Sequence, residues 1–177
     1  TQEEVEEMVK ALEIAKQRGL CRYTGFSTHD RRWAAMLFDK YPELMQMCCT
    51  PYTAKTKMVT DETGLWAAIR KHDVGWFGIK PFASNSVFRG TSAPDDPHAA
   101  EDSRMARLAI RCILCNQTIT APIPGLITPE QVDNVALAVK QRRILDANEQ
   151  AELDQAMDQA WASLTPDYQW LKGWEYV

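Results

Sequence analysis

Small and polar residues that could hold a charged ligand follow a short apolar run in the middle of the chain. The run spans residues 74–80, and it is followed by Pro81, Phe82, Ala83 and Ser84. Backbone N–H groups and small side chains in such a turn can cradle a pyrophosphate, and the Lys80 ammonium would add positive charge. The alternative is that Lys80 is a surface lysine at the end of a strand.

Neither the histidines nor the cysteines show a spacing that predicts catalysis or metal binding. His29, His72 and His98 stand alone, and His29 is best explained as part of the cap of the following helix. Cys112 and Cys115 have a Cys-x-x-Cys spacing at the end of a predicted helix, which favours core packing over redox chemistry. We therefore assign no catalytic residue and no metal ligand within the chain.

The composition is typical of a single globular domain. The chain has 177 residues, of which 45% are hydrophobic and 25% charged, and its net charge is −4. A mildly acidic chain has little general affinity for nucleic acid, and no segment approaches the roughly 20 apolar residues that cross a bilayer. Five cysteines in apolar segments favour reduced thiols, so we expect a cytoplasmic location, although an upstream segment could carry a targeting signal.

Helical and extended patterns alternate along the whole chain. We expect strands at residues 21–27, 44–49, 74–80 and 119–123. We expect helices at residues 5–16, 30–40, 61–72 (beginning at Asp61 or Thr63), 102–115, 130–140 and 146–164. Strands separated by helices require crossover connections, so the sheet should be parallel. This order fits either a small doubly wound sheet or part of a (β/α)8 barrel. The sequence has no G-x-G-x-x-G motif after its first strand, which makes a doubly wound sheet of the Rossmann type less favoured.

Four stretches of the sequence resemble consecutive strands of aldo/keto reductases. Residues 19–29 read GLCRYTGFSTH and resemble the fifth strand, usually G-x-V-R-x-x-G-x-S-N-H. Gln46 stands where the sixth strand has its Gln, and residues 75–85 resemble the seventh strand with its phosphate loop. Residues 121–131 read APIPGLITPEQ and are similar to the eighth strand and the adenosine-binding turn. The resemblance covers residues 1–140 and implies an α/β fold, the C-terminal half of a (β/α)8 TIM barrel. We expect residues 1–177 to form a single domain, in which residues 141–177 add a C-terminal helix and an aromatic tail.

The resemblance also implies NAD or NADP as the cofactor. Hydrogen bonds to the nicotinamide carboxamide would come from Ser27, Thr28 and Gln46, whose side chains can donate and accept. The pyrophosphate would lie against Lys80, Pro81, Phe82, Ala83 and Ser84, and the adenosine against Gly125, Gln131 and Asn134. The alternatives are that Ser27 and Thr28 only cap a helix and that residues 128–130 only begin one.

The residues at the adenosine end of the resemblance differ from those of family members that select NADP. Such members carry Lys, Ser and Arg around the 2′-phosphate, whereas this chain has Gly125, Leu126 and Gln131. A buried phosphate dianion without cationic partners is unfavourable. The difference favours NAD, or weak discrimination, over strict use of NADP.

The family's catalytic Asp, Tyr, Lys and His lie on the first four strands, which this chain does not contain. We therefore expect the complete protein to reduce a small-molecule carbonyl with a nicotinamide cofactor, and this chain alone to be inactive. The alternative is a non-catalytic half-barrel that self-associates or binds a partner, such as a missing N-terminal half-barrel, through its open strand edges. A third hypothesis is an independent small α/β binding protein. The tail residues Tyr168, Trp170, Trp174 and Tyr176 could cover the core, shape a substrate pocket or seal an interface.

Overall fold

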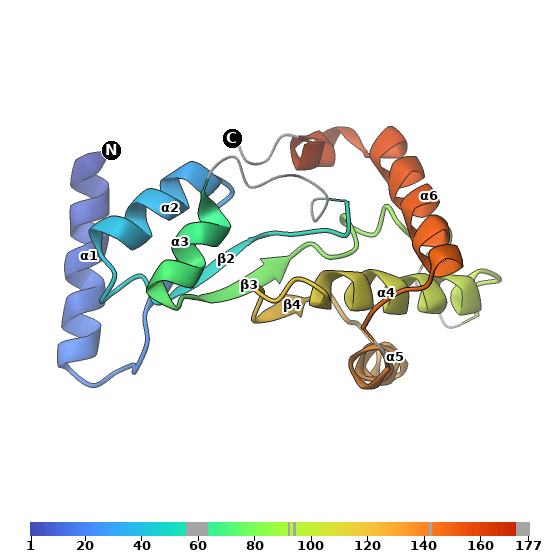
Figure 1. Ribbon diagram of the computed structural model, residues 1–177, viewed down its shortest axis with the longest axis horizontal. Coiled ribbons are helices and arrows are strands. Elements are labelled where there is room, and N and C mark those ends of the chain that lie inside the picture. Colours follow the sequence, from blue (N-terminus) through green and yellow to red (C-terminus); the bar gives the residue numbers. More distant parts are fainter. Residues whose placement is uncertain (56–63, 92, 94, 142, 173–177) are drawn as a thin grey trace.

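The computed structural model describes residues 1–55, 64–91, 93, 95–141 and 143–172, and every structural statement below concerns these residues. Helices and strands alternate along the chain (Figure 1). The strands are β1 (Gly25–Ser27), β2 (Met47–Pro51), β3 (Gly75–Ile79) and β4 (Ala121–Ile123). The helices are α1 (Gln2–Gln17), α2 (Arg31–Lys40), α3 (Leu65–His72), α4 (Ala99–Leu114), α5 (Pro129–Lys140) and α6 (Ala147–Ser163), followed by the 3-10 helix η2 (Pro166–Lys172). The expected helix start at Asp61 or Thr63 and the tail residues Trp174 and Tyr176 lie outside the described residues.

The four strands form one parallel sheet in the order β1-β2-β3-β4. This confirms the expectation that helical crossovers place the strands in parallel. Gly25 pairs with Met47, and a Cβ on Gly25 would lie 2.0 Å from the Met47 carbonyl oxygen. Only glycine therefore lets β1 approach β2 this closely.

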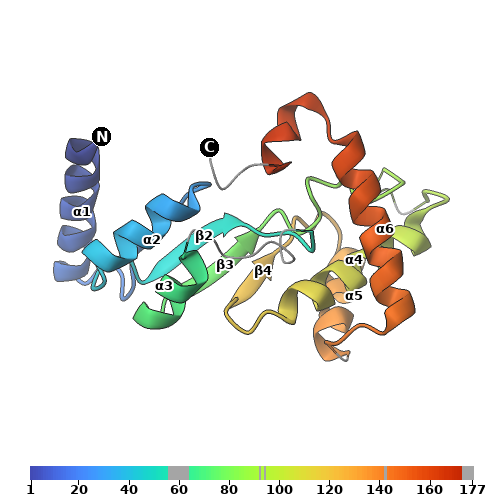
Figure 2. The ribbon, with the colours of Figure 1, turned by 45° about the horizontal axis from the view of Figure 1, so that its top comes forward.

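Helices α1, α2 and α3 cover one face of β1, β2 and β3. Cys48 and Trp76 point to this face and belong to one hydrophobic core with residues of the three helices, and Thr50 on the same face is also buried. The indole Nε1 of Trp76 donates to the Thr50 hydroxyl at 2.8 Å, so the polar atom at the centre of this core has a partner. Figure 2 shows α2 and α3 lying along β2 and β3.

The other face of the sheet is more exposed. Its side chains alternate with the buried ones, and Met47 and Ile123 are 38% and 45% exposed. The parallel register aligns Ser27, Cys49, Phe77 and Ala121 in one row across this face. In a parallel barrel this is the face that would point inward.

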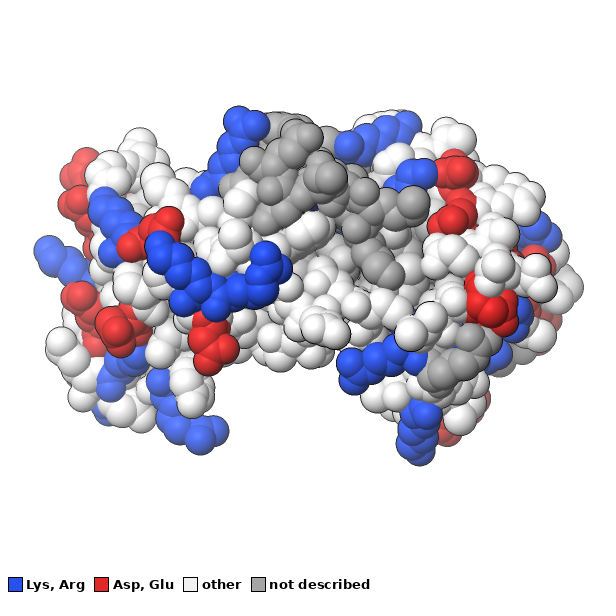
Figure 3. Space-filling view, in the orientation of Figure 1, with Lys and Arg blue, Asp and Glu red and all other residues white. Residues whose placement is uncertain are grey.

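A second core joins α4, α5, α6 and η2. Its members include Leu108, Ala138, Leu153, Met157 and Leu171. The helices of the two cores lie toward opposite ends of the molecule in Figure 1, with α1, α2 and α3 at one end and α4, α5 and α6 at the other. None of the helices in the described part of the chain combines the length and the apolar character needed to cross a membrane. Basic and acidic side chains are interspersed at both ends of the face seen in Figure 3.

The helix caps explain several of the boundaries. Asp30 accepts a hydrogen bond from the Trp33 N–H at 2.9 Å and caps α2, as expected from the sequence. Thr128 caps α5, with Pro129 in its first turn, and Asp146 caps α6. Gly19, with a φ of 67°, follows the C-cap of α1.

Candidate cofactor-binding site

The turn after β3 has an unusual backbone. Lys80, Ala83, Ser84 and Asn85 all have positive φ angles, between 48° and 68°. Each non-glycine residue in this region costs about 1 kcal/mol or more, so the surrounding structure must enforce the conformation. Hydrogen bonds from the Ala83 N–H to the Lys80 carbonyl and from the Phe88 N–H to the Asn85 carbonyl hold the turn. Strain of this kind is typical of binding sites.

Two hollows meet at the carboxyl ends of β3 and β4. One has a volume of about 520 Å³ and lies between the turn after β3 and residues 123–125, with Tyr168 of η2 at its side. The other has a volume of about 320 Å³ and lies between the long β3–α4 segment, α4 and the start of α5. Phe82, Asn85 and Gly125 line both, so the hollows adjoin.

Most of the residues predicted for the pyrophosphate lie at the larger hollow. It is lined by Lys80, Pro81, Phe82 and Ser84, whereas Ala83 is fully buried beneath the turn. The Ser84 hydroxyl oxygen is buried and has no hydrogen-bond partner among the described residues. A hydroxyl without a partner, beside a lysine, can donate to an anion that enters this hollow.

The η2 helix lies over the carboxyl ends of the strands. The Lys80 ammonium lies 5.4 Å from the centroid of the Tyr168 ring, and the His29 ring stacks on Trp170 at 4.2 Å. Burial, and to a smaller extent the positive charge of Lys80, lowers the pKa of His29. The described part of the tail therefore covers the site as well as the core, and it contributes Tyr168 to the larger hollow.

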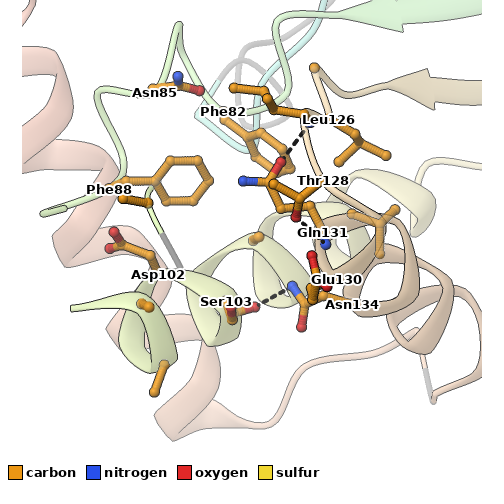
Figure 4. A pocket seen from close by; sticks show the side chains of 17 residues that line it. Phe82, Asn85, Phe88, Asp102, Ser103, Leu126, Thr128, Glu130, Gln131 and Asn134 are labelled. Atoms are coloured by element: carbon orange, nitrogen blue, oxygen red, sulfur yellow. Dashed lines mark hydrogen bonds between the residues drawn. The ribbon is translucent and has the colours of Figure 1, made fainter. Parts of the chain in front are cut away.

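The residues predicted for the adenosine line the smaller hollow, shown in Figure 4. Gly125, Gln131 and Asn134 are all at its wall. The Gln131 Oε1 accepts from the Ile127 N–H at 2.7 Å. The Asn134 amide is used by α4, because its Nδ2 donates to the Ser103 carbonyl at 2.9 Å and its Oδ1 accepts from Arg107. Asn134 thus joins α5 to α4 as well as lining the cavity.

Ser27 ends β1 and Thr28 follows it, at the same edge of the sheet. Ser27 is exposed on the face that would point inward. The Thr28 hydroxyl accepts from the Asp30 N–H at 3.1 Å, next to the N-cap of α2, which is the capping role considered as the alternative. Neither residue lines the two hollows, which lie at β3 and β4 on the opposite side of the sheet order.

The structure does not bring Gln46 together with the other predicted residues, because it places this residue at the amino end of the strands. Its N–H donates to the Thr24 carbonyl, its carbonyl accepts from the Gly75 N–H, and β2 begins only at the next residue. The Gln46 side chain accepts from the Lys16 Nζ of α1 at 3.0 Å. Gln46 therefore lies at the edge of the sheet opposite to Lys80 and Ser27, and it does not join them.

The sequence interpretation missed several residues that line the hollows. Phe88, Asp102 and Glu130 line the smaller one, and Tyr168 lines the larger one. Phe88 lies in a long segment without periodicity, so only its aromatic character in a loop could have marked it. Tyr168 belongs to the aromatic tail, for which a substrate pocket was one of three expected roles, but the position of the tail over the strand ends has no signal in the sequence.

The four parallel strands match part of a (β/α)8 barrel, and the two hollows lie at the edge of the sheet where such barrels bind ligands. No protein-family model matches the sequence, and no curated protein does. Solved structures of aldo-keto reductases do match the fold. The apo form of aldo-keto reductase AKR11C1 from Bacillus halodurans is 19% identical, with a TM-score of 0.58 over 86% of this chain and 56% of that chain. Its holo form has the same TM-score at 18% identity.

A third structure, the thermostable aldo-keto reductase Tm1743 in complex with the inhibitor epalrestat, is 19% identical, with a TM-score of 0.55. It is covered to 54% of its length by 85% of this chain. This chain therefore has an aldo-keto reductase-like fold and spans little more than half the length of these proteins.

Proposed function

We propose that the complete protein is an NAD(P)-dependent oxidoreductase of the aldo/keto reductase type, and that this chain is the C-terminal half of its barrel, which binds the cofactor. The observation that carries the proposal is the meeting of two predicted segments. Residues 80–84 and residues 125–134 are more than 40 positions apart, yet they line adjoining hollows at the carboxyl ends of neighbouring strands. Parallel α/β barrels bind their ligands at this edge.

The residues present fit the phosphate end of a dinucleotide. Lys80 offers an ammonium group, and Ser84 offers a buried hydroxyl without a partner among the described residues. Pyrophosphate bound there would lie between the two turns, with its adenosine in the smaller hollow beside Gly125 and Gln131. Ser27 would contact the nicotinamide carboxamide, with Thr28 as a second candidate if its hydroxyl also donates.

The bound cofactor supplies the hydride for reduction of a carbonyl substrate. This chain's own residues bind and orient the cofactor, and none of them is proposed as the proton donor for the forming alkoxide. That donor would come from the other half of the barrel, so the isolated chain should bind cofactor without turning over substrate.

The test is a titration of the complete polypeptide with NADH and with NADPH, followed by energy transfer from tryptophan to the reduced nicotinamide. We expect saturable binding, and we expect Lys80→Met to weaken it about tenfold or more because a charge-assisted contact is lost. Lys71→Met is the matched control, because Lys71 is 65% exposed on α3 and pairs only with surface groups such as Asp39. Absence of binding with both cofactors, or equal effects of the two substitutions, would refute the proposal.

A second candidate function is association through the open half-barrel, with a second copy or with an N-terminal half-barrel as the partner. The observation that favours it is the partly open inward face, where Met47 and Ile123 are exposed and Phe77 is half-buried. Both β1 and β4 are edge strands of the described sheet, and unpaired edges promote association. Light scattering after size-exclusion chromatography of the 177-residue chain tests this, and a sharp monomer at micromolar concentration would contradict it.

A further inference from the structure

A third hollow lies between α4, the end of α5 and the start of α6, the three helices that gather at one end of the molecule in Figure 2. Its volume is about 250 Å³. The described residues that line it are Arg104, Arg107, Leu108, Arg111, Gln141 and Glu149. None of these lines either of the hollows at the carboxyl ends of β3 and β4, so this hollow is distinct from those proposed for the cofactor.

Three arginines of α4 share the side of the helix that lines this hollow. Arg104, Arg107 and Arg111 follow i, i+3, i+7 spacing, which gathers their guanidinium groups on one face. Like charges at this spacing destabilise a helix, so negative charge close by stabilises the arrangement.

Two of these arginines have carboxylate partners on α6. Arg111 is almost fully buried, and its Nη1 and Nη2 each donate to the Glu149 carboxylate at 3.0 Å. Arg104 donates to the Glu152 carboxylate from Nε at 2.9 Å and from Nη2 at 2.7 Å. Each pair is bidentate, so the charges of Arg104 and Arg111 are offset within the protein.

Arg107 lies between these two pairs on α4 and has a neutral partner. Its Nη1 donates to the Asn134 Oδ1 of α5, and no carboxylate among the described residues forms an ion pair with its guanidinium. An arginine has five N–H donors, so most of those of Arg107 are available to another acceptor. An anion in the hollow would offset the charge of this half-buried guanidinium.

The acidic groups at the start of α6 are already used. Asp146 caps this helix and accepts from the N–H groups of Asn148 and Glu149 at 3.0 Å and 2.9 Å. The Glu149 carboxylate accepts from the Asp146 N–H at 3.0 Å in addition to Arg111. These carboxylates therefore serve the helix cap and Arg111, which leaves the charge of Arg107 to a ligand.

We infer that this hollow binds a small oxyanion, a phosphate or a carboxylate group, through Arg107. The planar guanidinium presents parallel N–H donors that match two oxygens of either group. The Gln141 side chain at the wall can add an amide donor. The hollow is small, and Glu149 lies at its wall, so a singly charged small molecule suits it better than a polyanion.

The test titrates the complete polypeptide with inorganic phosphate and, separately, with acetate at constant ionic strength, and it follows side-chain signals by nuclear magnetic resonance. We expect the Arg107 Nε–H signal to shift saturably. The side-chain amide signal of Asn134 should shift with it, because one hydrogen bond joins the two groups. Saturation by either ion supports the inference and identifies the preferred oxyanion, whereas saturation by neither overturns it.

Substitution of Arg107 tests the assignment of the site. Arg107→Gln removes the charge and keeps an amide that can donate to Asn134, and it should weaken oxyanion binding about tenfold or more. Arg70→Gln is the matched control, because Arg70 is an exposed arginine of α3 that also donates to a neutral oxygen, the Thr118 hydroxyl at 3.0 Å. Equal effects of the two substitutions would overturn the inference.

Arg107→Lys provides a second, milder change at the same position. It keeps the charge and loses the planar fork, so its affinity should fall between those of the wild type and Arg107→Gln. Circular dichroism checks that each variant is folded. An affinity for Arg107→Lys equal to that of the wild type would overturn the role of the guanidinium fork.

The turn after β3 could also attract a phosphate, and Lys80→Met separates the two sites. The inference predicts that this substitution leaves the titration of Arg107 unchanged. Loss of phosphate binding in Lys80→Met, with binding retained in Arg107→Gln, would assign the ion to the cofactor turn and overturn the inference while leaving the proposed function standing. Failure of NADH and NADPH to bind would remove the proposed function and leave the Arg107 site standing.

Discussion

Replacing Thr50 by valine tests whether the sheet depends on the hydrogen bond at the centre of its core. Thr50 on β2 and Trp76 on β3 are both fully buried, and the Trp76 Nε1 donates to the Thr50 hydroxyl at 2.8 Å. Valine has nearly the same shape as threonine, so the substitution removes the acceptor and leaves the indole N–H in place. A buried donor without a partner costs about 1–3 kcal/mol.

The expected loss in the free energy of unfolding is therefore about 1–3 kcal/mol. For a domain of this size each kcal/mol shifts the melting temperature by about 2–4 °C, so the midpoint should fall by about 2–12 °C. Thr50→Ser keeps the hydroxyl and should recover part of the loss. The matched control is Thr118→Val, because the Thr118 hydroxyl accepts from Arg70 at 3.0 Å in an exposed bond, and its loss should cost about 0.5 kcal/mol or less.

Urea denaturation of the complete polypeptide, followed by tryptophan fluorescence, measures these differences. The reasoning would be refuted if Thr50→Val were no less stable than Thr118→Val. Thr50→Ser keeps the acceptor and loses only a methyl group, so any deficit that it shows measures the packing of that methyl group and not the hydrogen bond.

Two further predictions concern the edges of the site. Gly25→Ala should lower the free energy of unfolding by about 1–3 kcal/mol, because the added Cβ meets the backbone of the neighbouring strand. Gly125→Ala is the control: a Cβ there has no atom within 4 Å, so the change should stay within about 0.5 kcal/mol in the same denaturation assay. Similar losses for the two variants would contradict this prediction. The pKa of His29 is lower in the folded protein than in the unfolded chain, so as the pH falls the unfolded chain binds a proton at His29 before the folded protein does. The contribution of His29 to stability is therefore complete above about pH 6.5 and is lost as the pH drops through the folded pKa. His29→Gln should reduce the loss of stability between pH 7 and pH 5, and a variant that loses as much as the wild type would argue against the burial of His29 under Trp170.

The order of elements could be predicted from the sequence because each boundary has a local cause. Asp30, Thr128 and Asp146 cap helices at the positions where their types and spacing indicated a start. Strands separated by helices must run parallel, whatever the details of their side chains. The choice between a barrel and a doubly wound sheet needed the resemblance, and the match in fold to aldo-keto reductases confirms that choice.

The exact span of each strand could not be predicted in the same way. Residues 44–49 are almost all apolar. Met45 lies in the connection and Cys48 in the strand, but both are fully buried, so the hydrophobic pattern does not distinguish them. The strand begins three residues later than expected, and three residues correspond to about 10 Å along a strand. That shift moves Gln46 from inside the expected strand to the amino edge of the sheet, where its side chain contacts Lys16.

The charges of the site also arise from the fold and not from any one segment. Lys80 lies in the turn after β3, Asp102 in the first turn of α4 and Glu130 in the first turn of α5, so no sequence window contains all three. The fold places the cation at the larger hollow and the carboxylates at the smaller one. A ligand with a negatively charged centre and a neutral aromatic end is favoured in one orientation only, because reversing it would bring its phosphates to the carboxylates and its ring to the lysine. If a dinucleotide binds there, this separation of charge fixes which end enters the smaller hollow, and it directs the other end toward the exposed inner face of the sheet, where Ser27 lies.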